Sequence, residues 1–225
     1  ADVSERLREA ERMRSLSKLY ERGREAYEAG DWSQAIDLLD QVVSAKEDYR
    51  DAAHLLRSAM VEKQLVYISQ DAEEAFENKQ WAEAIEHYQA IIAMRADYPR
   101  AQARLVEAKR QRQVEQAYHE GLRTFKGRRW LEAIVHFEEV LALDPANNEV
   151  RDLLAQASLQ KKLEDLYTQA QKNLEEKKWG EAEDCLQQIV ALQGTYRDVH
   201  RLLERARLQG QLATLYGQAM RAWEA

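Results

Sequence analysis

The sequence predicts an all-α protein in which long and short helices alternate in a repeating solenoid. The 225 residues include only eight glycines and two prolines, and helix formers such as Ala, Leu, Glu, Gln, Lys and Arg dominate. A stretch that contains tryptophan also recurs every 49 residues, as GDWSQAIDLL, KQWAEAIEHY, RRWLEAIVHF and KKWGEAEDCL. Recurrence at a period of roughly 20 to 50 residues is typical of repeat architectures, which have no single central core.

The same interval aligns many other positions. A small residue shares one column of the aligned units, and a large apolar residue shares another column four residues later. We therefore predict one array over residues 1–225, with units 2–50, 51–99, 100–148 and 149–197 and a partial unit 198–225. The two columns are Gly23, Ala72, Gly121, Ala170 and Ala219, and Tyr27, Phe76, Phe125, Leu174 and Trp223.

Each unit begins with a long helix. Residues 50–78 contain neither Gly nor Pro and predict one continuous helix of about 29 residues. Its apolar residues form two faces, one in each half of the helix, turned by about 140° from each other. A kink at Gly210, or a break between the two faces that gives three helices per unit, is the alternative. The residues between the faces are Arg14, Lys63, Arg112, Lys161 and Gly210.

A short helix follows at the tryptophan of each unit. Apolar residues at helical spacing predict an amphipathic helix of about 13 residues that begins at Trp32. In the linkers that follow, Asp48 with Asp51 and Thr195 with Asp198 have the spacing of helix N-cap pairs. Each short helix would pack antiparallel to the end of one long helix and the start of the next. We therefore expect long helices that point the same way and are staggered in an elongated solenoid.

In the second half of each unit, a small residue is followed by an aromatic residue at a turn, an alanine and a large apolar residue, as in Gly121, Trp130, Ala133 and Phe137. This pattern resembles the tetratricopeptide repeat (TPR) family. The resemblance covers about 30 residues in each of four units. It implies a right-handed solenoid and a role in protein–protein interaction. The 49-residue unit exceeds the family's repeat of about 34 residues, which adds about four turns to the first helix. Long units of this kind are similar to those of bacterial multidomain regulatory proteins. The third unit matches best, at Gly121, Trp130, Ala133, Phe137 and Pro145.

Composition and charge narrow the class of partner. The chain has 33 Lys and Arg against 40 Asp and Glu, and its net charge of −7 would repel nucleic acid and anionic membrane surfaces. No apolar stretch approaches the roughly 20 residues of a membrane span. The single cysteine, Cys185, fits a reducing compartment. We expect a cytoplasmic protein that binds a protein or peptide, with no nucleic acid and no membrane as partner.

The sequence offers no catalytic, cofactor or metal site. His87 and His136 share a column, but no His, Cys or acid recurs beside them at ligand spacing. Cys185 takes their place in the fourth unit without a recurrent basic partner. Motifs of phosphate-binding loops, nucleophile elbows and zinc proteases are missing from the sequence. We expect a protein that is not an enzyme and uses no cofactor.

Two aromatic columns are candidate contact residues. We interpret the tryptophans as packing residues that fix the turn between helices. A tyrosine column, interrupted by Ser69, has two interpretations. It is either buried with its hydroxyls at the rim, or a ladder that binds a partner peptide. The residues of this candidate ladder are Tyr20, Tyr118, Tyr167 and Tyr216.

The pattern also predicts open apolar faces near both ends of the chain. We expect either a longer parent protein or another chain to cover them. The first hypothesis is a non-catalytic protein-interaction or scaffold module, a fragment of a larger bacterial regulatory or signalling protein. The second is a structural module that self-associates end to end. The open faces comprise Val3, Leu7 and Ala10 at one end, and Leu212, Leu215, Tyr216, Ala219 and Trp223 at the other.

Overall fold

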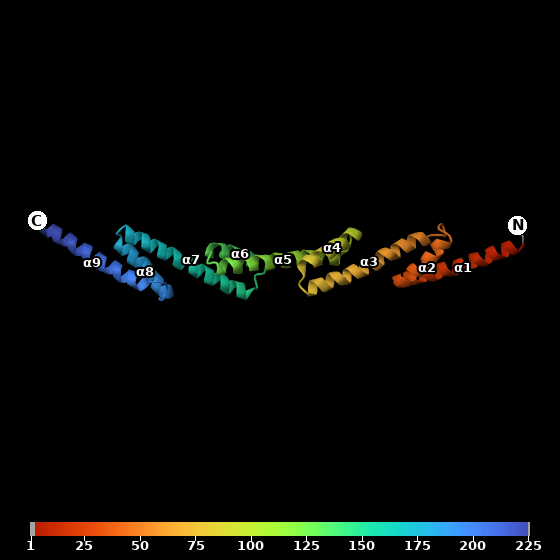
Figure 1. The fold of residues 1–225 in the computed structure, drawn as a ribbon, viewed down its shortest axis with the longest axis horizontal. Coiled ribbons are helices and arrows are strands. Elements are labelled where there is room, and N and C mark those ends of the chain that lie inside the picture. Colours follow the sequence, from red (N-terminus) through yellow and green to blue (C-terminus); the bar gives the residue numbers. More distant parts are fainter. Residues whose placement is uncertain (1–2, 225) are drawn as a thin grey trace. The chain divides into compact units, whose positions relative to one another are not determined.

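A computed structural model describes residues 3–224, which fold into nine α-helices and no strand (Figure 1). Long helices of 26 to 28 residues alternate with short helices of 14 or 15 residues. Residues 1, 2 and 225 of the predicted array lie outside the described residues. The helices are α1 (Val3–Glu28), α2 (Trp32–Ala45), α3 (Ala52–Glu77), α4 (Trp81–Met94), α5 (Pro99–Lys126), α6 (Trp130–Leu143), α7 (Asn148–Glu175), α8 (Trp179–Gln193) and α9 (Val199–Glu224).

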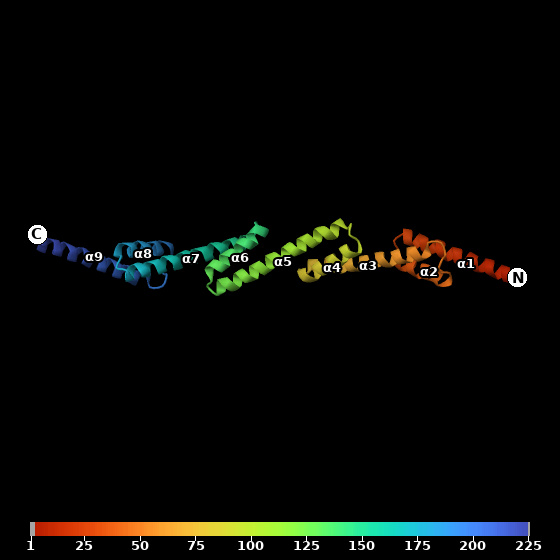
Figure 2. The same cartoon turned by 90° about the horizontal axis from the view of Figure 1, so that it is seen from above.

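The chain divides into two units within α5, between Arg112 and Gln113. In the first unit α1 and α3 run in the same direction, and α2 runs antiparallel to both (Figures 1 and 2). In the second unit α7 and α9 have the same relation to α8. Within each unit, the packing of every short helix between two long ones is the arrangement that the sequence predicts.

The long helices are continuous, so the alternative of three helices per unit is wrong. Helix α3 passes through Lys63 and α9 passes through Gly210 without leaving helical conformation. The two predicted faces of α3 are buried in different hydrophobic clusters. Its first half packs with α2 through Leu56, and its second half packs with α4 through Leu65. The charged column between the faces marks the point where one set of buried contacts ends and the next begins.

The first four long helices, α1, α3, α5 and α7, all end in the same turn. The residue two positions before the tryptophan adopts a left-handed conformation, with φ of 77° at Gly30 and 59° at Lys79. The amide of the next residue then donates to a carbonyl five residues earlier, as in Gln80 to Ala75 at 2.8 Å. This Schellman geometry satisfies the last carbonyls of the helix and turns the chain back on itself. Arg128 and Lys177 repeat the conformation.

The tryptophans pack against the ends of the long helices. Trp32 lies edge-on to Tyr27, with ring centroids 5.4 Å apart. Trp81 and Trp130 make the same contact with Phe76 and Phe125, each at 5.3 Å. These edge-to-face contacts fix the angle between a long helix and the short helix that follows it.

The predicted N-caps at Asp48 and Thr195 are wrong, because α3 and α9 begin later, at Ala52 and Val199. Asp51 occupies the N-cap position of α3, but its side chain makes no capping hydrogen bond. Its carboxylate accepts a hydrogen bond from Tyr20 instead. Side-chain caps do form at Asp31, which accepts from the amide of Gln34 at 3.0 Å, and at Asn147. The side chain of Asp51 therefore bonds to Tyr20 of another helix and not to the backbone of its own helix.

Candidate interaction surfaces

The tyrosine column lies at the joints where the second half of one long helix meets the start of the next long helix. The hydroxyl of Tyr118 donates to Glu149 at 2.7 Å, and that of Tyr167 donates to Asp198 at 2.7 Å. Tyr20 donates to Asp51 in the same way, and each pair is 31 residues apart. The acids stand at or near helix N-termini, where a negative charge is favourable. Each tyrosine therefore links two long helices.

Two of these joints share a larger arrangement that we call the tyrosine clasp. It consists of the tyrosine, a second tyrosine edge-on to it, an arginine over its ring and the acid that accepts its hydrogen bond. The arginine lies 4.7 Å from the ring centroid in both cases. Charge over an aromatic face adds an attraction that does not depend on close apolar packing. The clasps are Tyr20, Tyr49, Arg50 and Asp51, and Tyr167, Tyr196, Arg197 and Asp198.

The clasp shifts the acidity of its members. The hydrogen bond to Asp198, followed by burial, raises the pKa of Tyr167 above its ordinary value of 10.0. The hydrogen bond from Arg201, followed by that from Tyr167, lowers the pKa of Asp198. Both shifts favour the state in which a neutral phenol donates to a charged carboxylate.

Exposure differs along the predicted peptide ladder. Tyr20 and Tyr167 are buried, and Tyr118 is half-buried. Tyr216 alone among the four is open to solvent, with 70% of its surface exposed. The first three side chains are engaged within the fold, and the ladder stays a prediction. Tyr216 lies instead on the exposed surface of α9.

The second joint has no clasp and contains a cavity instead. Ser69 occupies the tyrosine position, and Arg100 occupies the position of the acid. The cavity has a volume of about 250 Å³, and Ser69, Tyr88, Tyr98 and Arg100 lie in its wall. In the sequence Ser69 is visible only as an interruption of the tyrosine column. The simultaneous exchange of an acid for Arg100 is the signal that could have located the cavity.

Tyr88 carries a buried hydroxyl in this cavity wall. Its side chain is almost fully buried, and its hydroxyl oxygen has no hydrogen-bond partner among residues 3–224. Burial, reinforced by the charge of Glu73, raises the pKa of Tyr88 to about 12, so the phenol stays protonated. A buried hydroxyl without a partner costs about 1 to 3 kcal/mol. Leu39, Phe137 and Leu186 occupy the same column and have no hydroxyl.

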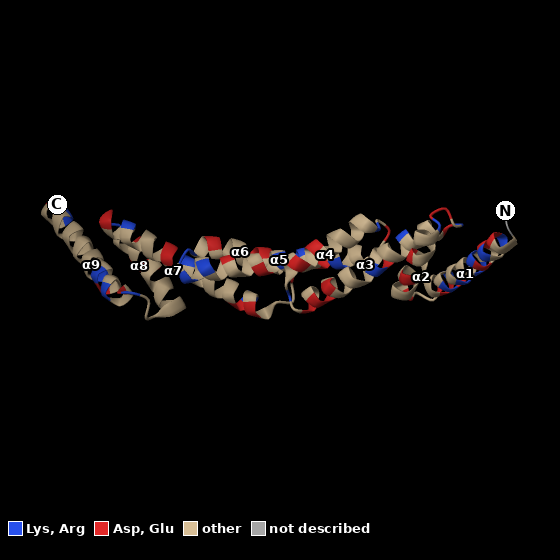
Figure 3. Ribbon diagram, turned by 45° about the vertical axis from the view of Figure 1, so that its right-hand side comes forward, with Lys and Arg blue, Asp and Glu red and all other residues tan. Residues whose placement is uncertain are grey.

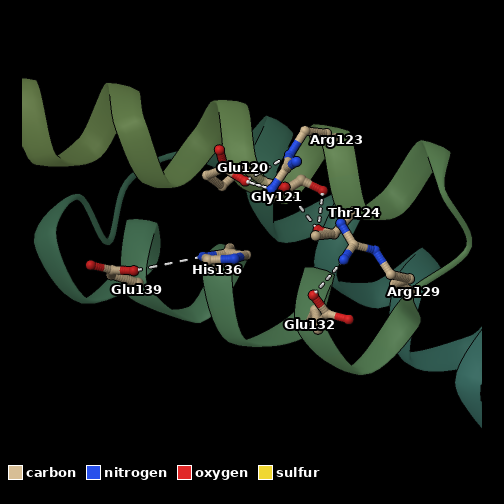
Figure 4. A network of polar contacts seen from close by, with 8 residues as sticks. All are labelled: Glu120, Gly121, Arg123, Thr124, Arg129, Glu132, His136 and Glu139. Carbon is tan, nitrogen blue, oxygen red and sulfur yellow. Dashed lines mark hydrogen bonds and ion pairs between the residues drawn. The ribbon is translucent and has the colours of Figure 1, made fainter.

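Polar side chains near the end of α5 and the start of α6 form local pairs. The buried hydroxyl of Thr124 donates to the carbonyls of Glu120 at 2.8 Å and Gly121 at 2.9 Å, within its own helix (Figure 4). The ion pairs drawn there all join residues three positions apart. Such pairs are typical of solvated helix surfaces. They are Glu120 with Arg123, Arg129 with Glu132, and His136 with Glu139.

The other candidate chemical residues are also isolated. His87 lies 3.9 Å from one carboxylate, that of Glu83. Burial raises the pKa of Cys185, which disfavours the reactive thiolate. Within residues 3–224 no group of three His, Cys, Asp or Glu side chains is placed to hold a metal ion.

The C-terminal half of α9 is an exposed apolar surface, which we call the α9 face. Between Leu208 and Trp223 the only charged residue is Arg221, and this end of α9 is mostly tan in Figure 3. A groove of about 1010 Å³ adjoins the face between Trp179 and Leu215. Leu208 and Met220, which are not among the predicted residues of the open face, extend the exposed residues of this half. The exposed large residues are Leu208, Leu212, Leu215, Tyr216, Met220 and Trp223, and Ala219 is exposed among them.

The start of α1 carries the other predicted open face. Val3 and Leu7 are both strongly exposed, and Ala10 is exposed beside them. The structure thus places the residues of both predicted faces at the surface. None of the described helices combines the length and the apolar character that crossing a membrane requires.

Comparison with known proteins adds no family to this description. No protein-family model matches the chain, and no curated protein matches it either.

Proposed function

We propose that this chain is a non-catalytic protein-interaction module, a scaffold that recruits its partner through the α9 face. The fold we propose for it is a TPR-like, right-handed solenoid with lengthened first helices. The local pairing of its polar side chains supports a role in binding rather than in catalysis. A cytoplasmic setting within a larger bacterial regulatory or signalling protein belongs to the same proposal.

The exposure of the α9 face carries the proposal. Leu163, Tyr167 and Leu174 of α7 are buried in one cluster with the apolar side of α8. The positions of α9 in the same columns are Leu212, Tyr216 and Trp223, and Trp223 is 87% exposed. An exposed patch of this kind, rimmed by polar residues, marks an interaction site.

The repeat itself specifies what fits the α9 face. In α7, α3 and α1 the corresponding surface is covered by a short antiparallel helix with one pattern of side chains. That helix begins with Trp, and has Ala at its fourth position, a large apolar residue at its eighth and a β-branched residue at its eleventh, as in Trp32, Ala35, Leu39 and Val42. We infer that the partner presents an amphipathic helix with this pattern, which docks as a helix in a groove.

A peptide of residues 177–193 tests this function, because it contains α8 and its preceding turn. Isothermal titration of this peptide into the whole chain should show saturable binding. Leu212→Glu should abolish the binding, because it places a charge in the centre of the α9 face. Leu131→Glu is the matched control, since Leu131 is 61% exposed on α6 and Leu212 is 50% exposed. Equal affinities of the two variants would contradict the proposal.

A second candidate function is end-to-end self-association. The exposed Val3 and Leu7 of α1 give the chain a second apolar surface that could receive the α9 face of another copy. Contacts between two different surfaces of one protein extend into filaments unless they close into a ring. This candidate predicts assembly that depends on concentration and needs no other protein.

A further inference from the structure

The second joint, between α3 and α5, differs from the other three joints between long helices at two positions. Where Tyr20, Tyr118 and Tyr167 stand in their joints, the second joint has Ser69. Where the other joints have an acid to accept the tyrosine hydrogen bond, it has Arg100. Both the aromatic ring and the negative charge of the clasp are therefore missing at the same place.

The cavity occupies the place of the missing ring. Its wall includes Ser69, Tyr98 and Arg100, and these positions correspond to the first tyrosine, the second tyrosine and the acid of a clasp. In the intact clasps the two tyrosine rings lie edge-on, with centroids 5.7 and 5.9 Å apart. A cavity of about 150 Å³ can already hold a benzene ring. The volume here, about 250 Å³, leaves room for a ring with one substituent.

The polar groups around the cavity favour an anion. Glu73, itself in the cavity wall, is paired with Arg100 at 3.1 Å and with Arg104 at 3.2 Å, so two cations offset its single negative charge. The buried hydroxyl of Tyr88 makes no hydrogen bond among residues 3–224, although the charge of Glu73 acts on it. A guanidinium and a neutral phenol are both donors, and a carboxylate can accept from both.

We propose that the cavity at Ser69 binds a small aromatic carboxylate. Its ring would replace the missing tyrosine ring against Tyr98, and its carboxylate would accept hydrogen bonds from Arg100 and Tyr88. The ligand would complete the second joint as the side chain of Tyr167 completes the fourth. This site is independent of the α9 face, since all of its residues lie on α3, α4, α5 and the linker before α5.

Ligand-observed NMR on the whole chain tests the site, with benzoate, phenol and acetate as probes. Benzoate should bind saturably, phenol more weakly and acetate not at all. A ring alone fills the cavity, whereas an anion alone has no apolar contact with it. Arg100→Gln should weaken benzoate about tenfold, the loss expected for one charge-assisted hydrogen bond, and leave phenol unchanged. Because the side chain of Arg100 is 71% exposed, this variant should keep the fold.

Ser69→Tyr is the decisive variant, because it restores the side chain of the other joints and fills the cavity. We expect it to abolish benzoate binding, with helix content checked by circular dichroism. Ser44→Tyr adds the same ring at an exposed position of α2 and should bind benzoate as the wild type does.

Several results would overturn the site. They are an absence of benzoate binding to the wild type, full binding by a folded Ser69→Tyr variant, or an equal loss of phenol and benzoate in Arg100→Gln. Binding of a ring only when it belongs to a peptide would also overturn it, and would assign the cavity to the protein partner.

Discussion

At the scale of single residues, a phenol hydroxyl connects segments that are 31 residues apart. Tyr167 is buried and its hydroxyl donates to the carboxylate of Asp198, which precedes α9. The joint therefore depends on the protonation of one group and the charge of the other. Because the pKa of Tyr167 is raised and that of Asp198 is lowered, the folded state holds this pairing over a wide range of pH.

Tyr167→Phe should lower the free energy of unfolding by about 1.5 to 3 kcal/mol at neutral pH, because one hydrogen bond to a charged acceptor is lost. The raised pKa adds a dependence on pH. Its stabilising contribution is complete below the ordinary value of 10.0 and is lost as the pH rises through the higher pKa of the folded state. As the pH rises through 10.0 and then through the raised pKa of folded Tyr167, the wild type should therefore lose more stability than Tyr167→Phe.

Urea unfolding followed by circular dichroism measures both effects. Tyr216→Phe serves as the control, because the Tyr216 side chain is 70% exposed and should contribute little at any pH. A Tyr167→Phe variant with the stability and alkaline loss of the wild type would show that the hydroxyl does not hold the joint.

A second prediction at this scale concerns the left-handed residue of each turn. Lys177 has a φ of 59°, a conformation that glycine adopts without strain and that a β-branched residue resists. Lys177→Gly should change the free energy of unfolding by less than about 1 kcal/mol, because relief of strain opposes the greater freedom of the unfolded chain. Lys177→Val should lower it by about 1 to 3 kcal/mol. Thermal unfolding of the pair measures the difference, and equal stabilities would contradict the Schellman turn.

At the scale of the helix, the residue pattern predicted where each helix lies but not which side chains bond between helices. The sequence predicted a helix over residues 50–78, and α3 spans Ala52–Glu77. The difference at its start arises because Arg50 takes a positive φ of 48° in the clasp. Periodicity shows which side of a helix is buried, but a contact between Tyr20 and Asp51 depends on two helices meeting. The clasps and the cavity at Ser69 could therefore not be predicted from the residue pattern of one segment alone.

Two glycines on different long helices, Gly121 of α5 and Gly217 of α9, have opposite surroundings. An added Cβ at Gly121 would lie 2.6 Å from the ring of Phe137, whereas at Gly217 it would meet no atom within 4 Å. Gly217→Ala should therefore increase the helical protection of the α9 face, by about 1 kcal/mol of local stability. Gly121→Ala should lower global stability by about 1 to 3 kcal/mol, because Phe137 must move.

Amide hydrogen exchange around residue 217 and chemical denaturation measure the two glycine effects separately. Gly180→Ala is a useful reference, since that position is also open, but it lies on α8. A stabilising Gly121→Ala would contradict the close packing of α5 on α6.

At the scale of the whole chain, burial is distributed rather than central. The described hydrophobic residues form four clusters, and each cluster contains one short helix. Stability in such an array is close to a sum over neighbouring contacts, so a local change need not unfold the rest. The chain can therefore have a cavity in one cluster and an open face beyond another. The same design permits tests at one site with little effect at a distant one.

Self-association is the property of the whole chain that the two open faces predict. If the α9 face of one copy packs on the start of α1 of another, then Trp223→Glu and Leu7→Glu should each abolish assembly, because each buries a charge in the contact. Light scattering over a series of concentrations measures this. A mixture of the two variants should form dimers that grow no further, since Trp223→Glu retains an intact α1 face and Leu7→Glu retains an intact α9 face. If Leu7→Glu assembles as the wild type does while Trp223→Glu does not, the α9 face pairs with itself, and the end-to-end contact is wrong.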